Sequence, residues 1–280
     1  MKKLQLGRFN SLPVLRRAEQ GLYLEGGPEG SILLPNKYVP EGAQEGDVLD
    51  VFLYLDQQER LIATTLQPKA QVGEFACLAV NWVNNFGAFL DWGLEKDLFV
   101  PFREQKQKMQ KGHSYIVHLH VDKETFRIVA SAKVEHWLSK DIPPYRAGDQ
   151  VDVLVWQKTE LGFKVIADNQ FPGLIYDSDV FRELRSGDRL TAYVKQVRGD
   201  GKLDLTLQRQ GQQGVADFST VLLEHIRSNG GVVPLGDKSQ PEEIYALFGV
   251  SKKVFKKAVG DLYKQRLITI EPQELRLATP

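Results

Sequence analysis

The sequence lacks several features on which secreted proteins, membrane proteins and many metalloproteins depend. Its 280 residues contain one cysteine, Cys77, so an intrachain disulfide and a multi-thiolate zinc site are both excluded. No apolar run approaches the ~20 residues that cross a membrane. The N-terminus also lacks the apolar core of a signal peptide. We therefore expect a cytoplasmic protein with no membrane partner.

The sequence also has no excess of either charge, because 36 Lys and Arg are balanced by 36 Asp and Glu. This balance excludes a simple polycationic nucleic-acid binder but leaves room for local basic surfaces. Hydrophobic residues make up 42% of the chain and charged residues 26%, which is typical of a globular protein.

Common catalytic motifs are absent as well. The sequence shows no glycine-rich phosphate loop ending in Lys-Ser/Thr, no HExxH motif and no nucleophile elbow. His118, His120 and Asp122 share one side of a predicted strand, which would be the start of a metal site. No fourth ligand is apparent, and a half-exposed strand face is the more ordinary interpretation. We expect a protein that is not an enzyme and needs no cofactor or metal.

What the sequence does contain is an internal repeat. Leu33-Leu34-Pro35 aligns with Phe99-Val100-Pro101 at a shift of 66 residues, and with Leu174-Ile175-Tyr176 after a further 75. The same shifts superpose Gly46-Asp47 on its counterparts at 112–113 and 187–188. Several anchors that hold one register indicate three related units.

Each unit has the composition of β-structure. Short runs rich in β-branched and aromatic residues, such as Tyr115 to Val121, are separated by turn residues such as Asn84-Asn85. About five short strands in each unit predict a small closed barrel of the oligonucleotide-binding type. The predicted fold is mainly β, with tandem five-stranded barrels at 1–67, 69–138 and 143–209.

The remaining residues, 215–280, change to helical periodicity. Apolar residues from Phe218 to Ile226 recur at helical spacing, and a second helix is predicted to begin with a capping box at Ser239-Gln240-Pro241-Glu242. Ser251 is predicted to cap a third helix. Two short strands follow, which predicts an α+β winged-helix domain.

These features resemble a known family. Residues from Val80 to Asp91, with Phe86-Gly87-Ala88-Phe89 at their centre, resemble the second-strand signature of the S1 RNA-binding domain. The second unit carries the match best, and the first is the most degenerate. Three S1-like units followed by a winged helix resemble the conserved virulence factor B family of bacterial RNA-binding proteins. That resemblance implies a post-transcriptional regulator of gene expression that binds single-stranded RNA.

Binding of single-stranded RNA needs aromatic planes on which bases stack and cations near the phosphates. In the second unit, the S1 pattern implies Phe86 and Phe89 as stacking residues, with Trp82 nearby. The alternative is that these aromatics fill the barrel core. The implied RNA-binding residues are Trp82, Phe86, Phe89, Asp122 and Arg127 in the second unit, and Phe163, Tyr176 and Lys202 in the third.

Two departures from the S1 pattern limit what the resemblance implies. S1 domains commonly have a His at the turn where this chain has Pro35, Pro101 and Tyr176, and a proline neither stacks as a planar ring nor donates a hydrogen bond. The first unit also lacks the Phe-Gly-x-Phe pair and shows only Gly21-Leu22-Tyr23. The first unit is therefore expected to be a structural or protein-contacting barrel.

Local positive charge adds weaker candidates for phosphate contact. The second unit has a charge of +2 over 69–140. Its lysines and those of the last domain's third helix are either phosphate contacts or parts of solvated surfaces. These lysines are Lys106, Lys108, Lys111, Lys253, Lys256, Lys257 and Lys264.

Two other functions stay open. A transcription regulator would use the winged helix on duplex DNA, with the barrels as docking modules. Against it, Glu271 and Glu274 occupy the expected wing and would repel phosphate, and the third helix offers few side chains that read base edges. A ribosome-associated factor would use the barrels on structured RNA and protein.

Overall fold

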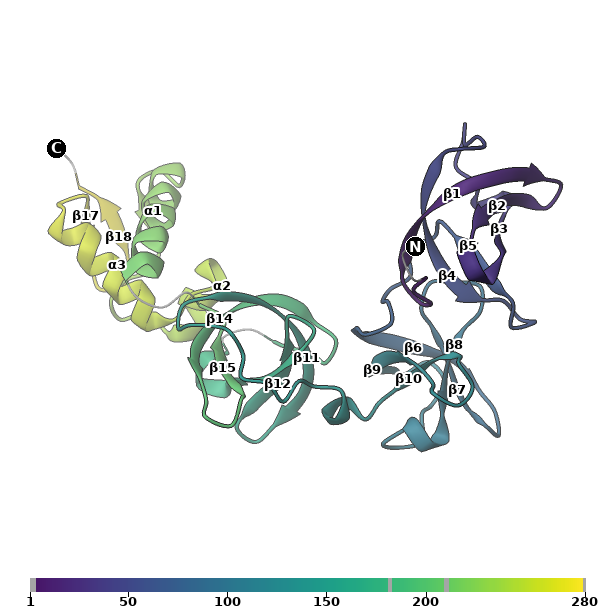
Figure 1. The fold of residues 1–280 in the computed structure, drawn as a ribbon. Coiled ribbons are helices and arrows are strands. Elements are labelled where there is room, and N and C mark those ends of the chain that lie inside the picture. The colour runs from purple at the N-terminus through teal and green to yellow at the C-terminus, as the bar shows by residue number, and fades with distance from the viewer. Residues whose placement is uncertain (1–3, 181–182, 209–211, 279–280) are drawn as a thin grey trace. The chain divides into compact units, whose positions relative to one another are not determined.

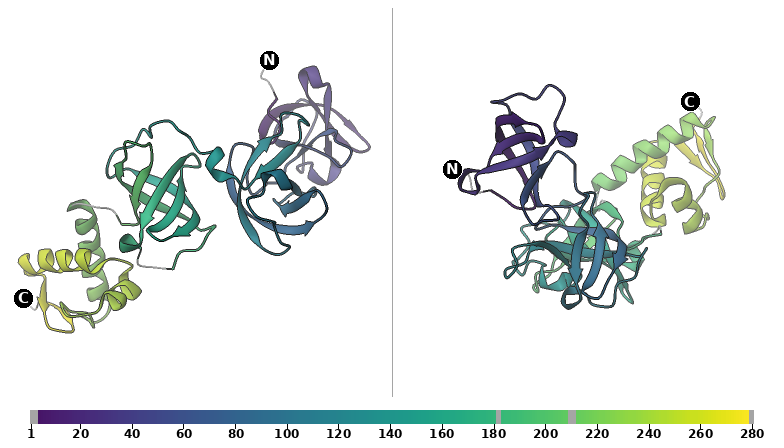
Figure 2. Two further views of the ribbon diagram at one scale, coloured as in Figure 1. Left: turned by 90° about the horizontal axis from the view of Figure 1, so that it is seen from below. Right: turned by 90° about the vertical axis from the view of Figure 1, so that its right-hand side faces the viewer.

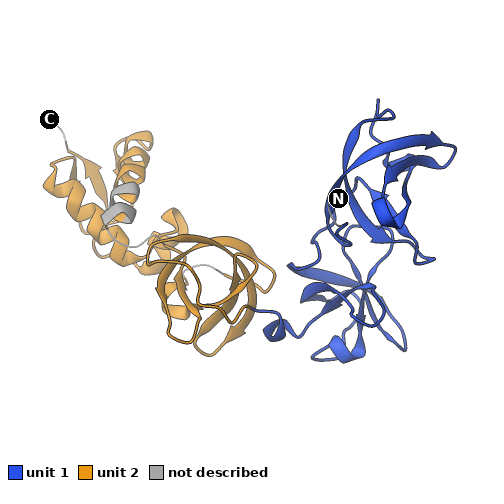
Figure 3. Cartoon of the chain, in the orientation of Figure 1, with its two compact units in different colours: residues 1–138 blue, residues 139–280 orange. Residues whose placement is uncertain are grey.

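Three closed five-stranded barrels precede a winged-helix domain in the computed structural model, which describes residues 4–180, 183–208 and 212–278 (Figures 1 and 2). The predicted fold class is therefore confirmed. The chain divides into two compact units, residues 1–138 and 139–280 (Figure 3). The first unit contains barrels 1 and 2, and the second contains barrel 3 and the winged helix.

The barrels share one topology, in which the third and fifth strands pair in parallel and close the sheet. Barrel 1 consists of β1 (Phe9–Ala18), β2 (Gly21–Glu25), β3 (Ser31–Pro35), β4 (Val48–Leu55) and β5 (Leu61–Thr64). Barrel 2 consists of β6 (Phe75–Val83), β7 (Gly87–Asp91), β8 (Leu98–Pro101), β9 (Ser114–Val121) and β10 (Ile128–Ser131). Barrel 3 consists of β11 (Gln150–Thr159), β12 (Gly162–Ala167), β13 (Phe171–Tyr176), β14 (Arg189–Val197) and β15 (Leu203–Thr206).

A glycine opens the second strand of every barrel because a backbone carbonyl lies against it. A Cβ atom would lie 2.0 Å from the carbonyl oxygen of Leu34 at Gly21, 2.2 Å from that of Val100 at Gly87, and 2.1 Å from that of Ile175 at Gly162. Any side chain at these positions would force the second and third strands apart. The glycines of the repeat are thus requirements of strand packing.

The first strand of each barrel contains a β-bulge that shifts its register by one residue. The shift lies between Val14 and Arg16 in β1, between Val80 and Trp82 in β6, and between Val155 and Gln157 in β11. A bulge bends the strand and increases its twist, which helps a small sheet to close. It also decides which residue of the first strand opposes the second strand.

The hydrophobic core of barrel 2 extends to one face of barrel 1, whose own interior forms a separate cluster. Phe52 of β4 is fully buried and packs edge-on against Phe9, with ring centroids 5.6 Å apart, and against Trp92 of barrel 2 at 5.7 Å. Tyr54 and Ile62 of barrel 1 belong to the same cluster. The apolar face that joins the two barrels is therefore continuous with the interior of barrel 2.

The winged helix consists of α1 (Gln212–Ser228), β16 (Val232–Val233), α2 (Pro241–Phe248), α3 (Lys252–Lys264), β17 (Ile268–Ile270) and β18 (Leu275–Leu277). Ser251 caps α3 as predicted, since its hydroxyl accepts a hydrogen bond from the Val254 N–H. The predicted cap of α2 is wrong by one residue. Gln240 is the N-cap, and Ser239 instead accepts from the Gly236 N–H at 2.9 Å.

No helix in the described part of the chain has the length and apolar character that a membrane crossing requires.

Truncation of the shared aromatic at position 52 should destabilise the first unit. We expect Phe52→Ala to lower the free energy of unfolding by about 3–5 kcal/mol, because it leaves a cavity where two barrels meet. Val48→Ala, on the same strand but 63% exposed, should change it by less than about 0.5 kcal/mol. Urea unfolding followed by tryptophan fluorescence measures both. Equal effects of the two substitutions would contradict this packing between the barrels.

Candidate nucleic-acid interface

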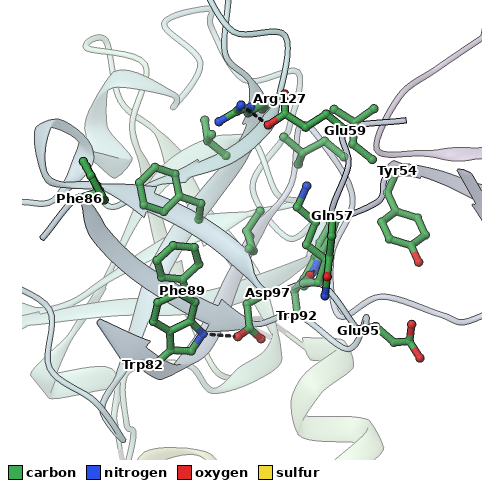
Figure 4. A pocket seen from close by; sticks show the side chains of 16 residues that line it. Tyr54, Gln57, Glu59, Trp82, Phe86, Phe89, Trp92, Glu95, Asp97 and Arg127 are labelled. Carbon is green, nitrogen blue, oxygen red and sulfur yellow. Dashed lines mark hydrogen bonds and ion pairs between the residues drawn. The ribbon is translucent and has the colours of Figure 1, made fainter. Parts of the chain in front are cut away.

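Barrel 2 carries an open pocket of about 630 Å³ whose lining brings together four of the predicted residues (Figure 4). Trp82 comes from β6, Phe89 from β7, Phe86 from the loop between them, and Arg127 from the turn before β10. Phe99 of β8 extends the aromatic surface.

The centre of this surface is a parallel stack of two rings. Trp82 and Phe89 lie face to face, with centroids 3.7 Å apart and planes 2° from parallel. The Trp82 indole N–H donates to Asp97 at 2.8 Å, and the Asn81 amide donates to the other oxygen of the same carboxylate at 2.8 Å. The bond from Trp82 to Asp97, drawn in Figure 4, holds the indole ring in its orientation.

Phe86 lies at the edge of the pocket with 74% of its surface exposed. Its loop is ordered by Asn84, whose side-chain oxygen accepts hydrogen bonds from the backbone N–H groups of Phe86 and Gly87. Trp82 is 43% exposed, and Phe89 is only partly buried between Trp82 and Phe99. The alternative that these aromatics fill the barrel core is therefore wrong.

Asp122 and Arg127 are joined by a backbone hydrogen bond, but their side chains do not pair with each other. Arg127 forms an ion pair with Glu59 of barrel 1, and the carboxylate of Asp122 pairs with Arg103. Asp122 is buried and accepts hydrogen bonds from the backbone N–H groups of residues 124 and 125. The hydrogen bond from Thr125 is the main reason why the pKa of Asp122 is lowered to about 2. Asp122 stabilises its turn and lies outside the pocket lining.

The third barrel presents a different surface. Its bulge places Gln157 opposite Lys164, where barrel 2 has Trp82 opposite Phe89. Phe163 corresponds to the buried Ala88 but is only partly buried: it packs against the barrel core, and Lys158 Nζ lies 4.3 Å from the centre of its ring.

The other two predicted residues of this barrel are engaged in local contacts. The Tyr176 hydroxyl donates to Asp204 at 3.2 Å, and Lys202 pairs with Asp200 in its turn at 2.9 Å. The pair that opposes across the first two strands of barrel 3, Gln157 and Lys164, contains no aromatic ring and so forms no stack like that of barrel 2.

The first barrel has a cation in the equivalent place. The Arg16 guanidinium lies 4.0 Å from the centre of the Tyr23 ring, and these two residues oppose each other after the bulge as Trp82 and Phe89 do. Sequence reasoning missed this pair, because in the first unit it compared only Gly21-Leu22-Tyr23 with the signature. The 66-residue shift of the repeat places Arg16 on Trp82 and Tyr23 on Phe89, and could have found it.

The predicted lysines of barrel 2 lie outside the pocket lining. Lys106 forms an ion pair with Glu135, and Lys108 lies 5.9 Å from the centre of the Phe102 ring. Lys111 is exposed in the loop before β9. These positions are those of a solvated loop.

Of the four predicted lysines of α3, one forms an ion pair and three are exposed to solvent. Lys256 pairs with Asp237 at 2.9 Å. Lys253, Lys257 and Lys264 are exposed, so they are available to phosphate. On the wing, Arg276 pairs with Glu274, which leaves the turn between β17 and β18 predominantly acidic.

His118 and His120 form a separate cluster under Trp137, whose ring lies 4.4 Å and 4.2 Å from theirs. The Nδ1 atoms of both histidines are buried and have no hydrogen-bond partner. Burial lowers the pKa of His118 to about 4. Within the described residues, no three His, Cys, Asp or Glu side chains are placed to hold a metal ion.

Comparison with known proteins agrees with this architecture. The family model of the CvfB-like winged helix domain matches residues 220–277, and the S1 domain model matches 6–66. YitL of Bacillus subtilis is 32% identical over 268 residues, covering 92% of this chain and 89% of its own. The chain belongs to the conserved virulence factor B family. Its domains are of nucleic-acid-binding types.

Other members and a solved structure extend this comparison. Conserved virulence factor B of Staphylococcus aureus is 24% identical over 265 residues, covering 91% of this chain and 88% of its own. The crystal structure of a multidomain protein with nucleic acid binding domains from Streptococcus pneumoniae is 27% identical in sequence. The match covers 97% of this chain and 98% of that chain, with a TM-score of 0.44. The S1 match over 6–66 falls on the unit that sequence reasoning ranked as the most degenerate.

The turn role of Asp122 predicts an acid-dependent contribution to stability. Because the pKa of this carboxylate is about 2 in the folded protein and 3.8 ordinarily, its ionised form stabilises the fold above about pH 4. That stabilisation disappears as pH falls through about 2. The difference in free energy of unfolding between the native protein and Asp122→Asn should therefore shrink from pH 5 to pH 2. Urea titrations across this range test it, and a pH-independent difference would contradict the assignment.

Proposed function

We propose that the protein binds single-stranded RNA through the pocket of barrel 2, and that it acts without catalysis as a post-transcriptional regulator in the cytoplasm. The observation that carries this proposal is the exposed ring of Phe86 beside the Trp82–Phe89 stack. A single exposed aromatic side chain is ordinary, but several that line one pocket form the kind of apolar surface that marks a binding site.

Base stacking is the interaction that this surface supports best. A base in the pocket would contact Phe86 at the edge and the rings of Phe89 and Phe99 below. Stacking on an aromatic side chain contributes roughly 1–3 kcal/mol per base and is available only where bases are unpaired. Arg127 and Lys96 lie in the same lining together with three carboxylates, so the pocket has no excess of positive charge.

The regulatory part of the proposal rests on domain composition and family membership. Three S1-like barrels and a winged helix in one chain fit a protein that occupies a stretch of transcript. The exposed lysines of α3, Lys253, Lys257 and Lys264, would add nonspecific phosphate contacts. The acidic wing disfavours specific reading of duplex DNA.

Loss of the Phe86 ring should weaken RNA binding with little effect on folding. We expect Phe86→Ala to raise the dissociation constant for a single-stranded RNA about 5- to 150-fold, the equivalent of one stacked base. Fluorescence anisotropy of labelled RNA, measured on the full chain at two salt concentrations, gives this ratio.

Phe126→Ala is the matched control. Phe126 is 71% exposed on the same barrel but does not line the pocket, so its loss should leave affinity unchanged. RNA affinity that is the same in Phe86→Ala as in the native protein would remove the pocket from the proposal. Binding of duplex DNA in preference to RNA would favour the winged helix instead.

A further inference from the structure

The pocket of barrel 2 is not built by barrel 2 alone. The turn between β4 and β5 of barrel 1 contributes Gln57 and Glu59 to its lining, and Tyr54 at the end of β4 contributes a third side chain (Figure 4). Both barrels belong to one compact unit and are in contact at Phe52 and Trp92. The turn therefore forms one wall of the pocket, opposite the aromatic stack.

Polar contacts fix this wall in place. The Asp56 carboxylate closes the turn by accepting hydrogen bonds from the backbone N–H groups of Gln58 and Arg60. From barrel 2, Lys96 Nζ donates to the Asp56 carbonyl at 2.7 Å, and Arg127 pairs with Glu59. Glu59 has a φ of 64°, an unusual conformation for a residue with a side chain. Such a conformation is retained where the surrounding contacts define it.

The charges of the pocket do not suit a phosphate. Three carboxylates line it, Glu59, Glu95 and Asp97, against the two cations Lys96 and Arg127. Both oxygens of Asp97 already accept hydrogen bonds, and Glu95 pairs with Lys37. Glu59 Oε1 pairs with the Arg127 guanidinium of barrel 2. The wall thus offers an acceptor and donors side by side.

We propose that Glu59 and Arg127 together read the Watson–Crick edge of a base stacked in the pocket, and that they select guanine. Guanine presents the O6 acceptor beside two donors, N1–H and the N2 amino group. The Arg127 guanidinium donates to O6, and the Glu59 carboxylate accepts from N1–H and N2–H. Adenine, cytosine and uracil do not present an acceptor followed by two donors. This inference rests on the proposed function and makes barrel 1 the specificity element of a shared site.

The test uses the full chain and four labelled RNA heptamers. Each has uridine at six positions and guanosine, adenosine, cytidine or inosine at the central position. Inosine keeps O6 and N1–H but lacks the N2 amino group. We expect the guanine oligonucleotide to bind about 5- to 150-fold more tightly than the adenine one, with inosine in between. In Glu59→Gln this preference should fall to near unity, while affinity for the other oligonucleotides is kept or raised because Arg127 is released.

Glu41→Gln removes the same charge from an exposed position of barrel 1 outside the pocket, and it should keep the preference for guanine. Equal binding of all four oligonucleotides by the native protein would overturn the inference and leave the proposed function standing. A guanine preference that survives in Glu59→Gln would also overturn it. Failure of every oligonucleotide to bind would instead overturn the proposed function itself.

Discussion

The bulge in the first strand of each barrel is the constraint on which the aromatic surface of barrel 2 depends. In barrel 2 the extra residue is Asn81, and it brings Trp82 opposite Phe89. In a regular strand without the bulge, Asn81 would stand opposite Phe89 instead of Trp82, because a shift of one residue moves each side chain to the other side of the strand. The aromatic stack, its hydrogen bonds to Asp97 and the pocket beside it all follow from that register.

The same backbone carries three different chemistries in one chain. The pair after the bulge is Arg16 and Tyr23 in barrel 1, two stacked aromatic rings in barrel 2, and Gln157 with Lys164 in barrel 3. The glycine that opens the second strand is constant because a carbonyl oxygen occupies the space of its side chain. Closure of the barrel thus fixes the backbone and leaves the outward pair free to vary.

The contacts that hold barrel 1 against barrel 2 also assemble the pocket. The Phe52–Trp92 contact buries apolar surface between the barrels, and the polar contacts of Lys96 and Arg127 lie at the edge of that core. Burial lowers the pKa of Lys96. The wall of the pocket is therefore held by the contacts that join the two barrels.

The sequence by itself determined the three barrels, the winged helix and the aromatic candidates, because strand periodicity, turn residues and caps are local signals. The sequence also indicated Asp122 and Arg127, but it predicted that they act together, because both lie near the same turn of the repeat. Only the tertiary structure decided that Asp122 closes its turn while Arg127 reaches Glu59. That ion pair joins residues 68 positions apart on two barrels. Local patterning does not encode how one folded barrel packs against the next, and that packing assembles the pocket.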